Sequence, residues 1–524
     1  MNRYLDALVA NFADGNRVFA TMVRDGRDEA ISWRDLEAAS RAFLAAYRRA
    51  GVQPGGTILI FLRHVPELYG SFFGAMLGGF VPSFMPCTSP RQSPAIYWPS
   101  HRTLVERIAP SLVVADRATL AEMAGNGLVP PRSLAIEEVA PADADWSIPP
   151  SDAIGLLQHS SGTTGLKKGV ALCYDALAAQ IDAYAASLGA TRADTIASWL
   201  PLYHDMGLIA CLVIPAMLGI PVVQLDPFEW VGRPETLFDA IARHRATLCW
   251  LPNFAFDHLA IVAGKRGASF DLSSVRAFIN CSEPCKPASF DRFAAAFAVP
   301  PEKLHCCYAM AETVFAVTQT ELGAPPARSE RDGAALIETG APLAGVAISI
   351  HDEHRAPVPE GAIGEIAISC PFLFSGYNRE PERTAERLDG DRYFTRDLGF
   401  LKDGRLYVLG RLDDLIIVSG RNLYAHEVEA LVSGVPGVKP GRAVAVAEFD
   451  PRLGTQALTI IAERAAPKAD PATGRAISDI VFSTIGVMPR VHLVAEGWLV
   501  KTTSGKISRE ANLKKLASLK NSVV

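Results

Sequence analysis

Hydroxyl, glycine and lysine residues crowd together in SSGTTGLKKG, residues 160–169, directly after a short apolar run suited to a buried strand. Glycines let a backbone turn tightly and point several N–H groups at one anion. Hydroxyls add hydrogen-bond donors, and lysine adds a positive charge that suits phosphate. The spacing is not that of a GxxxxGK[ST] loop. The run predicts either a loop that grips a polyphosphate or a flexible turn between strands.

Three further stretches carry residues suited to a nucleotide. In CYAMAET, Tyr308 ends a predicted buried strand, downstream of NCSEP, and its ring could lie against a flat base. Glu312 in the same stretch could hold Mg²⁺ between phosphate oxygens, or could simply place a charge at a helix N-terminus. In YFTRDLGFL, Asp397 could accept both hydroxyls of a ribose, or could cap backbone N–H groups in a turn.

Two charged stretches lie nearer the C-terminus. Arg411 and Asp413 belong to GRLDDLIIVSG, where the texture of the sequence changes, and Lys506 stands in the Ser/Gly-rich turn KTTSGKISR. Taken singly, the first predicts a solvated linker and the second an exposed lysine. Whether these two stretches contribute to a site depends on which elements bring them toward the other motifs.

Hydrophobic patterning predicts those elements. From Ser32 the segment SWRDLEAASRAFLAAYRRAG predicts an amphipathic helix that Ser32 caps, with Asp35 in its first turn and Gly51 at its end. Strands at 57–62 and 111–116 flank a second helix at 66–79. Such alternation is typical of a parallel sheet with crossover helices.

The alternation continues to about residue 330, through helices at 174–188, 233–245 and 254–264 and strands at 195–200, 221–225 and 247–251. We expect an α/β fold: a large N-terminal domain of doubly wound sheets over residues 1–410, including a β-rich subdomain at about 337–410. Residues 411–414 are the predicted hinge. Residues 415–524 are predicted to form a small, mobile α+β domain.

Composition excludes several classes of protein. The 524 residues are 49% hydrophobic and 20% charged, which is typical of a well-packed protein too long for one core. The net charge of −5 gives no electrostatic case for binding nucleic acid. The N-terminus lacks the apolar core of a secretion signal. The nine cysteines are scattered through apolar segments without zinc-site spacing, which favours reduced thiols in a cytoplasm.

One uncharged run, MGLIACLVIPAMLGIPVV at residues 206–223, has the length of a membrane span. Pro215 and Pro221 interrupt it, so a helix followed by a buried parallel strand is the better prediction. No membrane span is expected.

The ordered combination of motifs resembles the adenylate-forming superfamily, which includes acyl- and aryl-CoA synthetases, luciferases and peptide-synthetase adenylation domains. SSGTTGLKKG, YAMAE, the D-L-G strand end, GRLDD and SGKISR occur in the family's order over nearly the whole chain. LPLYHDMGLI, LPNFAFDHL and DLSSVRAFINCSEP further resemble the fatty acyl-AMP ligase branch. Members of that branch activate a carboxylic acid and pass it to a carrier-protein thiol. The resemblance implies a ligase that uses ATP and Mg²⁺.

The resemblance also implies roles for the matching residues. The residues implied to contact phosphate are Ser161, Thr163, Thr164, Gly165 and Lys168. The adenine pocket falls to Ser282, Glu283, Pro284, Tyr308, Ala309, Met310 and Ala311. Asp397 and Arg411 would hold the ribose, Glu312 would bind Mg²⁺, Asp413 would be the hinge, and Lys506 would reach the acyl carboxylate and α-phosphate. His204 would lie near the carboxylate or pyrophosphate. Side-chain size places the acid pocket at Trp199, His204, Trp250, Asn253, Phe254, Phe256 and Met310, which favours a short or medium chain.

The sequence departs from the family pattern at several positions. Lys167 stands where proline is usual, and Ala309 and Cys281 replace glycines near the adenine. The insertion that disfavours CoA as acceptor in fatty acyl-AMP ligases is shortened to residues 317–338. The acceptor therefore stays open between a carrier protein and CoA. A non-catalytic adenylate-binding relative is a further alternative, which the presence of Lys506 and Glu312 disfavours. A serine hydrolase would need a G-x-S-x-G elbow, which is absent.

Overall fold

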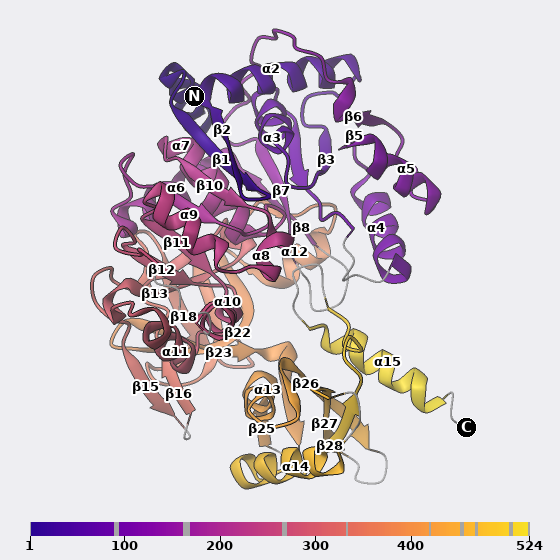
Figure 1. Cartoon of the computed structure of the whole chain (residues 1–524), viewed down its shortest axis with the longest axis vertical. Helices are drawn as coiled ribbons and strands as arrows, with labels where there is room; N and C mark the ends of the chain where they lie inside the picture. The colour runs from indigo at the N-terminus through magenta and orange to yellow at the C-terminus, as the bar shows by residue number, and fades with distance from the viewer. Residues whose placement is uncertain are drawn as a thin grey trace.

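The computed structural model describes residues 2–88, 94–160, 168–264, 270–331, 334–418, 421–450, 455–466, 470–501 and 507–521 (Figure 1). Most of the predicted phosphate loop, residues 161–167, and the turn at 502–506 with Lys506 lie outside the described residues.

A nine-stranded sheet with the order β17-β14-β13-β12-β11-β9-β10-β1-β2 organises the large N-terminal part. The six inner strands are parallel: β1 (Val18–Arg24), β9 (Ile196–Ser198), β10 (Val222–Leu225), β11 (Leu248–Leu251), β12 (Ala277–Asn280) and β13 (Leu304–Ala309). Antiparallel strands close its edges: β2 (Arg27–Ser32), β14 (Ala316–Gln319) and β17 (Ala341–Pro342). Open sheets of this kind bind ligands at the carboxyl ends of their parallel strands.

Helices flank this sheet (Figure 1). They are α1 (Arg3–Asn11), α6 (Tyr174–Leu188), α7 (Ile214–Leu218), α8 (Pro227–Gly232), α9 (Thr236–His244), α10 (Asn253–Val262) and α11 (Pro287–Phe297). Short 3₁₀ turns occur at Phe12–Asp14, Ile136–Glu138, Pro301–Lys303 and Ala311–Thr313. The last of these carries Glu312 directly behind β13.

A second, four-stranded parallel sheet has the order β4-β3-β5-β6. Its strands are β3 (Thr57–Phe61), β4 (Val81–Phe84), β5 (Leu112–Ala115) and β6 (Ser133–Ala135), and its helices are α2 (Trp33–Arg49), α3 (Glu67–Leu77), α4 (Pro94–Ile108) and α5 (Arg117–Gly125). The two parallel sheets and their helices confirm the predicted doubly wound α/β class.

A three-stranded antiparallel sheet brings the residues after the phosphate loop next to a distant segment. β8 (Lys168–Cys173) pairs with β7 (Ile154–Ser160) on one side and with β20 (Gly376–Tyr377) on the other. This pairing places Tyr377 opposite Val170, two residues beyond Lys168.

Antiparallel strands dominate residues 328–411. They are β15 (Arg328–Arg331), β16 (Ala334–Ile337), β18 (Ala347–His351), β19 (Gly364–Ser369), β21 (Leu388–Asp389), β22 (Arg392–Lys402) and β23 (Arg405–Arg411), with one helix, α12 (Pro381–Arg387). The predicted antiparallel β-rich texture is present.

The C-terminal part has its own α+β structure, seen in orange to yellow in Figure 1. Its elements are β24 (Leu415–Val418), β25 (Arg421–Tyr424), α13 (Ala425–Ser433), β26 (Val438–Asp450), β27 (Thr455–Arg464), α14 (Pro471–Ile485), β28 (Arg490–Val494) and α15 (Arg509–Asn521). Two of its hydrophobic clusters draw only on residues between Ile416 and Leu516, whereas the main core of the chain runs from Tyr4 to Leu406. The proposed division at 411–414 falls between these sets of residues.

Local signals explain where several elements begin. Ser32 Oγ accepts a hydrogen bond from the Asp35 backbone N–H, and the Asp35 carboxylate accepts one from the Ser32 backbone N–H, which completes a capping box at α2. The uncharged run at 206–223 forms a π-helix (Met206–Val213), then α7 and β10. Across the described parts of the chain, no helix is long and apolar enough to cross a membrane.

Candidate active site

Tyr308, Asp397 and Arg411, which lie far apart in the sequence, meet in one polar cluster. The Tyr308 hydroxyl donates to Asp397 Oδ2 at 2.6 Å, and Arg411 Nε lies 3.2 Å from Asp397 Oδ1. The pairing of β22 with β23 sets Asp397 directly opposite Arg411. Strands of two different sheets, β13 on one side and β22 with β23 on the other, therefore meet at one carboxylate.

Burial opposes the charge on this carboxylate. It raises the pKa of Asp397, while the Arg411 guanidinium and the Tyr308 hydroxyl act in the opposite direction. Asp397 in turn raises the pKa of Arg411, although burial lowers it. A half-buried carboxylate with two strong partners is held in one orientation, which suits the recognition of a diol.

Glu312 belongs to a second polar cluster. Its Oε1 accepts a hydrogen bond of 2.7 Å from the Tyr377 hydroxyl, and the Tyr393 hydroxyl lies 3.3 Å from that of Tyr377. Glu312 is only 8% exposed. Burial raises the pKa of Tyr377, so its hydroxyl keeps the proton that it donates.

Lys168 points at the same cluster. Its Nζ lies 4.9 Å from the centre of the Tyr377 ring. Burial lowers the pKa of Lys168 to about 8, although the nearby Glu312 acts to raise it. A poorly hydrated ammonium beside a carboxylate is ready to bind an anion such as phosphate.

Three residues around these clusters adopt left-handed backbone conformations that favour glycine. They are Ser282 (φ 71°), Val314 (φ 62°) and Arg396 (φ 63°). Val314 is β-branched, so the left-handed conformation strains its backbone. It follows Glu312 by two residues. Strain of this kind concentrates where a fold must hold functional groups in place.

The predicted adenine segment after β12 is tied to the predicted acid segment. Glu283 Oε2 accepts a hydrogen bond of 2.9 Å from the Phe254 backbone N–H, in the first turn of α10. This bond joins the carboxyl ends of β11 and β12. Ala309 and Ala311 flank Met310 between β13 and Glu312, and Pro284 follows Glu283.

Aromatic side chains gather at the carboxyl ends of β9, β10 and β11. The Trp199 and Trp230 rings are stacked with their centres 3.7 Å apart and their planes 6° from parallel. The Phe254 ring presents its edge to both, at 5.9 and 6.5 Å. Trp230 was not among the predicted residues, because nothing in its local sequence marks it as a partner of Trp199.

Three of the predicted acid-pocket residues have partners inside the protein. The Trp250 indole donates to the Tyr184 hydroxyl at 2.9 Å, and Phe256 packs 5.1 and 5.0 Å from Phe290 and Phe293. Asn253 bonds to Ser289, Asn280 and the Lys286 backbone. These contacts hold the three side chains in the core, whereas Phe254 is 43% exposed. Their role as acid contacts stays a prediction.

His204 stands at the start of the π-helix. Its ring lies 4.8 Å from that of Tyr203, and its backbone carbonyl accepts from the Leu208 N–H at 2.7 Å. A π-helical segment is frequent at functional sites. The role of His204 near the acid carboxylate or the pyrophosphate stays a prediction.

Ion pairs surround the predicted hinge, which forms a 3₁₀ turn at Leu412–Asp414. Arg396 donates from Nη2 to Asp413 Oδ1 at 2.5 Å, and Arg509 of the C-terminal part contacts Asp414 at 2.9 Å. Asp413 is therefore bonded to the strand that carries Asp397. Its hinge role is a prediction that these contacts leave open.

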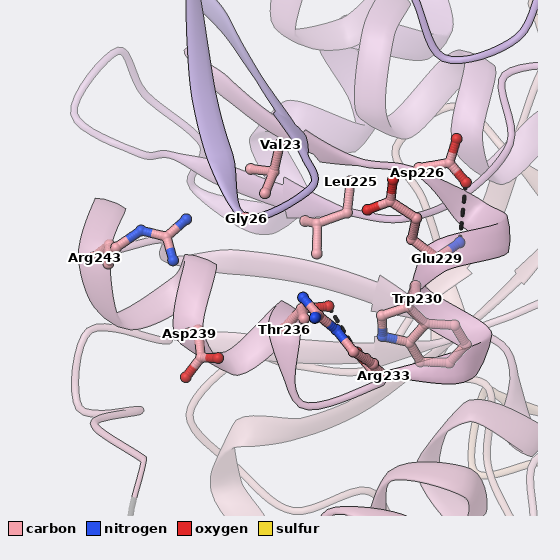
Figure 2. Close-up of a pocket in the computed structure, with 10 residues that line it drawn as sticks. All are labelled: Val23, Gly26, Leu225, Asp226, Glu229, Trp230, Arg233, Thr236, Asp239 and Arg243. Atoms are coloured by element: carbon pink, nitrogen blue, oxygen red, sulfur yellow. Dashed lines mark hydrogen bonds between the residues drawn. The ribbon is translucent and has the colours of Figure 1, made fainter.

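Two cavities lie away from the polar clusters around Asp397 and Glu312. One, of about 90 Å³, lies beside Trp230 between the β1–β2 hairpin and α8 and α9 (Figure 2). The other, of about 250 Å³, is lined by Gln319, Glu338 and Arg405 among others. No predicted site residue lines either cavity, so the site is identified by its polar clusters and not by these hollows.

Comparison with known proteins assigns the family. The model of a family described as "AMP-binding enzyme" matches residues 10–378. The chain belongs to this family. It is therefore an adenylate-forming ligase, whose nucleotide substrate is ATP.

Three similar proteins illustrate the relationship. The probable long-chain-fatty-acid–AMP ligase FadD30 of Mycobacterium tuberculosis is 31% identical over 456 residues, which cover 77% of each chain. The medium-chain-fatty-acid–[acyl-carrier-protein] ligase JamA of Moorena producens is 29% identical over 407 residues, 69% of this chain and 67% of JamA. A solved structure from work on fatty acyl-adenylate ligases of E. coli and L. pneumophila superposes with a TM-score of 0.91, at 23% identity, over 99% of this chain and 98% of that one.

Proposed function

We propose that the protein activates a fatty or related carboxylic acid as an acyl-adenylate and then passes the acyl group to the phosphopantetheine thiol of an acyl carrier protein. The observation that supports this most is the convergence of Asp397, Arg411 and Tyr308 beside the Glu312–Tyr377 pair, in a chain of the AMP-binding family. One carboxylate is poised for a ribose, and the other lies beside a lysine suited to phosphate.

In this proposal the adenosine lies along the carboxyl ends of β12 and β13. Asp397 and Arg411 bind the ribose, Tyr308 and the segment from Ser282 to Pro284 border the base, and Lys168 binds the outgoing phosphates. The loop residues Ser161, Thr163, Thr164 and Gly165 share that last task. These roles are consistent with the positions of the described residues. The roles of the loop residues rest on the motif alone.

Glu312 fits a site for Mg²⁺ that is completed by the nucleotide. Among the described residues no group of three or more His, Cys, Asp or Glu side chains is arranged around a metal. Mg²⁺ is commonly held by one or two carboxylates together with substrate phosphates and water. Tyr377 occupies Oε1, and no described residue donates to Oε2. When bound, the ion would neutralise phosphate charge.

The first reaction joins two anions. A carboxylate oxygen of the acid attacks the α-phosphorus, the bond between the α-phosphorus and the bridging oxygen breaks, and pyrophosphate leaves with that electron pair. Cations must offset the repulsion, which is the role proposed for Lys168 at the leaving group and for Lys506 at the reacting centre. In the second reaction the thiol sulfur attacks the acyl carbon, its proton is lost, and AMP leaves.

The acceptor distinguishes the two versions of this proposal. The name of JamA specifies an acyl carrier protein as its substrate, which supports the carrier. The short segment 317–338 instead supports CoA, because the longer insertion of fatty acyl-AMP ligases is associated with disfavouring CoA as acceptor. In this chain that segment includes both strands of an antiparallel pair, β15 and β16.

Two assays test the proposal in sequence. Exchange of labelled pyrophosphate into ATP should depend on an added acid, and a panel from short to long chains, with hydroxy and aryl variants, would identify the acid. Thioester formation is then measured with holo carrier protein and with CoA. Efficient use of CoA without use of the carrier would overturn the acceptor, and absence of exchange across the panel would overturn the adenylation.

A further inference from the structure

Tyr377 lies between the two groups that are proposed to bind the phosphates and the metal. The pairing of β20 with β8 fixes its backbone, and further hydrogen bonds flank the strand: Asn378 N–H donates to the Gly169 carbonyl at 2.7 Å and Ser375 N–H donates to the Ala171 carbonyl at 2.8 Å. The Tyr377 backbone N–H donates to Thr384 Oγ1 at 2.9 Å. The residue is 4% exposed and has little freedom to move.

Its side chain makes two different kinds of contact. The hydroxyl donates to Glu312 Oε1 at 2.7 Å, and the ring lies 4.9 Å from Lys168 Nζ. A hydrogen bond to one oxygen of a carboxylate fixes its orientation and leaves the other oxygen for a cation. A ring beside an ammonium attracts it without neutralising its charge. The charge of Lys168 therefore stays available to phosphate.

We propose that Tyr377 is a positioning residue that holds the Glu312 carboxylate for Mg²⁺ and the Lys168 ammonium for pyrophosphate in one fixed relation. This inference rests on the roles proposed above for Glu312 and Lys168. The phenol hydroxyl serves the metal side and the ring serves the phosphate side. The two tasks can therefore be removed separately.

Packing is the competing explanation, because the Tyr377 ring also lies 4.9 Å from Phe374. Tyr377→Phe removes only the hydroxyl and keeps the ring beside Lys168 and Phe374. Tyr393→Phe is a matched control: it removes a neighbouring buried hydroxyl that contacts Tyr377 at 3.3 Å and has no bond to Glu312. Tyr377→Leu removes the hydroxyl and the ring together.

The experiment measures metal binding apart from turnover. Full-length variants are saturated with a non-hydrolysable ATP analogue and titrated with Mn²⁺, with free ion followed by electron paramagnetic resonance. Tyr377→Phe should weaken Mn²⁺ binding about tenfold, within the range typical of lost carboxylate partners at metal sites. Tyr393→Phe should change it less than about twofold, given the absence of a bond to Glu312. The KM for pyrophosphate in exchange should stay near the wild-type value in Tyr377→Phe and rise about threefold or more in Tyr377→Leu.

The outcomes separate this inference from the function on which it rests. Wild-type Mn²⁺ affinity in Tyr377→Phe, beside weakened binding in Glu312→Gln, overturns the inference and leaves the proposed function intact. Equal weakening in Tyr377→Phe and Tyr393→Phe assigns the effect to packing and also overturns it. Wild-type Mn²⁺ affinity in Glu312→Gln overturns the metal role of Glu312 and the inference together.

Discussion

The two halves of the candidate site are built from different chemistry. Around Asp397 and Glu312, hydroxyl, carboxylate and guanidinium groups form direct hydrogen bonds and ion pairs. Around Trp199, stacked and edge-on aromatic rings meet with few polar contacts. A nucleotide is the same in every reaction of the family, whereas the acid varies. The polar half therefore suits the shared substrate, and the aromatic half suits selection among acids.

Removal of the proposed reacting-centre cation gives the largest expected effect. Lys506→Ala should lower acid-dependent ATP–pyrophosphate exchange by about 10²–10³-fold, because loss of one group that stabilises transition-state charge typically costs that much. All acids should be affected equally. Lys514→Ala is the matched control, since Lys514 is a largely exposed lysine that pairs with Glu510 on α15. A loss restricted to some acids would contradict a role for Lys506 in the chemistry that all acids share.

The next effect falls on the ribose carboxylate. Asp397→Asn removes the charge that Arg411 and Tyr308 contact, and a hydrogen bond to a charged group is worth about 1.5–3 kcal/mol. The KM for ATP should rise about 10–100-fold by that reasoning, with the ranking of acids unchanged. Asp391→Asn, at an exposed carboxylate that accepts from Ser369, should leave the KM unchanged.

A substitution in the aromatic half should change the ranking of acids by kcat/KM and should leave the overall rate unchanged. Trp230→Leu opens space behind Trp199, so kcat/KM for longer acids should rise relative to short ones by about tenfold, within the range that a methylene or two contributes in an apolar pocket. Trp33→Leu removes a comparably buried indole that packs against Phe12 and Phe19, and should lower stability without changing the ranking. An unchanged ranking in Trp230→Leu would remove the aromatic half from the acid pocket.

The last effect is on stability and not on activity, through the strand that carries Tyr308. Burial lowers the pKa of His305, on β13, to about 4 from an ordinary value near 6.5. The unfolded chain therefore binds the proton first as the pH falls, and the free energy of unfolding should decrease between about pH 6.5 and 4, by up to about 1.4 kcal/mol per pH unit. Thermal unfolding across this range should show a shallower acid dependence in His305→Gln. The same slope in both proteins would contradict a neutral, buried His305.

Local signals in the sequence were enough for several helices, and the order of the motifs indicated three residues of the polar half. The predicted helix at 174–188 coincides with α6, and Ser32 with Asp35 marked the start of α2. The motifs containing Tyr308, Asp397 and Arg411 indicated residues that the structure brings together. Strands and helices with strong periodicity are determined by neighbouring residues. The site residues were indicated by the order of motifs along nearly the whole chain.

Contacts that depend on long-range pairing could not be predicted in this way. Tyr377 reaches Lys168 only because β20 pairs with β8, and no pattern in SGYNRE indicates that partner. Trp230 follows β10 and stacks on Trp199, which lies directly after β9. Side-chain size alone assigned Trp250 and Phe256 to the acid pocket, whereas they have partners in the core. Large side chains fill cores as readily as pockets, so size cannot distinguish the two.

A double-mutant cycle tests the separation of the two halves most directly. ATP–pyrophosphate exchange is measured with a short and a long acid for the wild type, Asp397→Asn, Trp230→Leu and the double variant. We expect the two substitutions to act independently, so that their effects on kcat/KM add within about 0.5 kcal/mol for each acid. A coupling of 1 kcal/mol or more, by the same measure, or a change of acid ranking caused by Asp397→Asn, would contradict it.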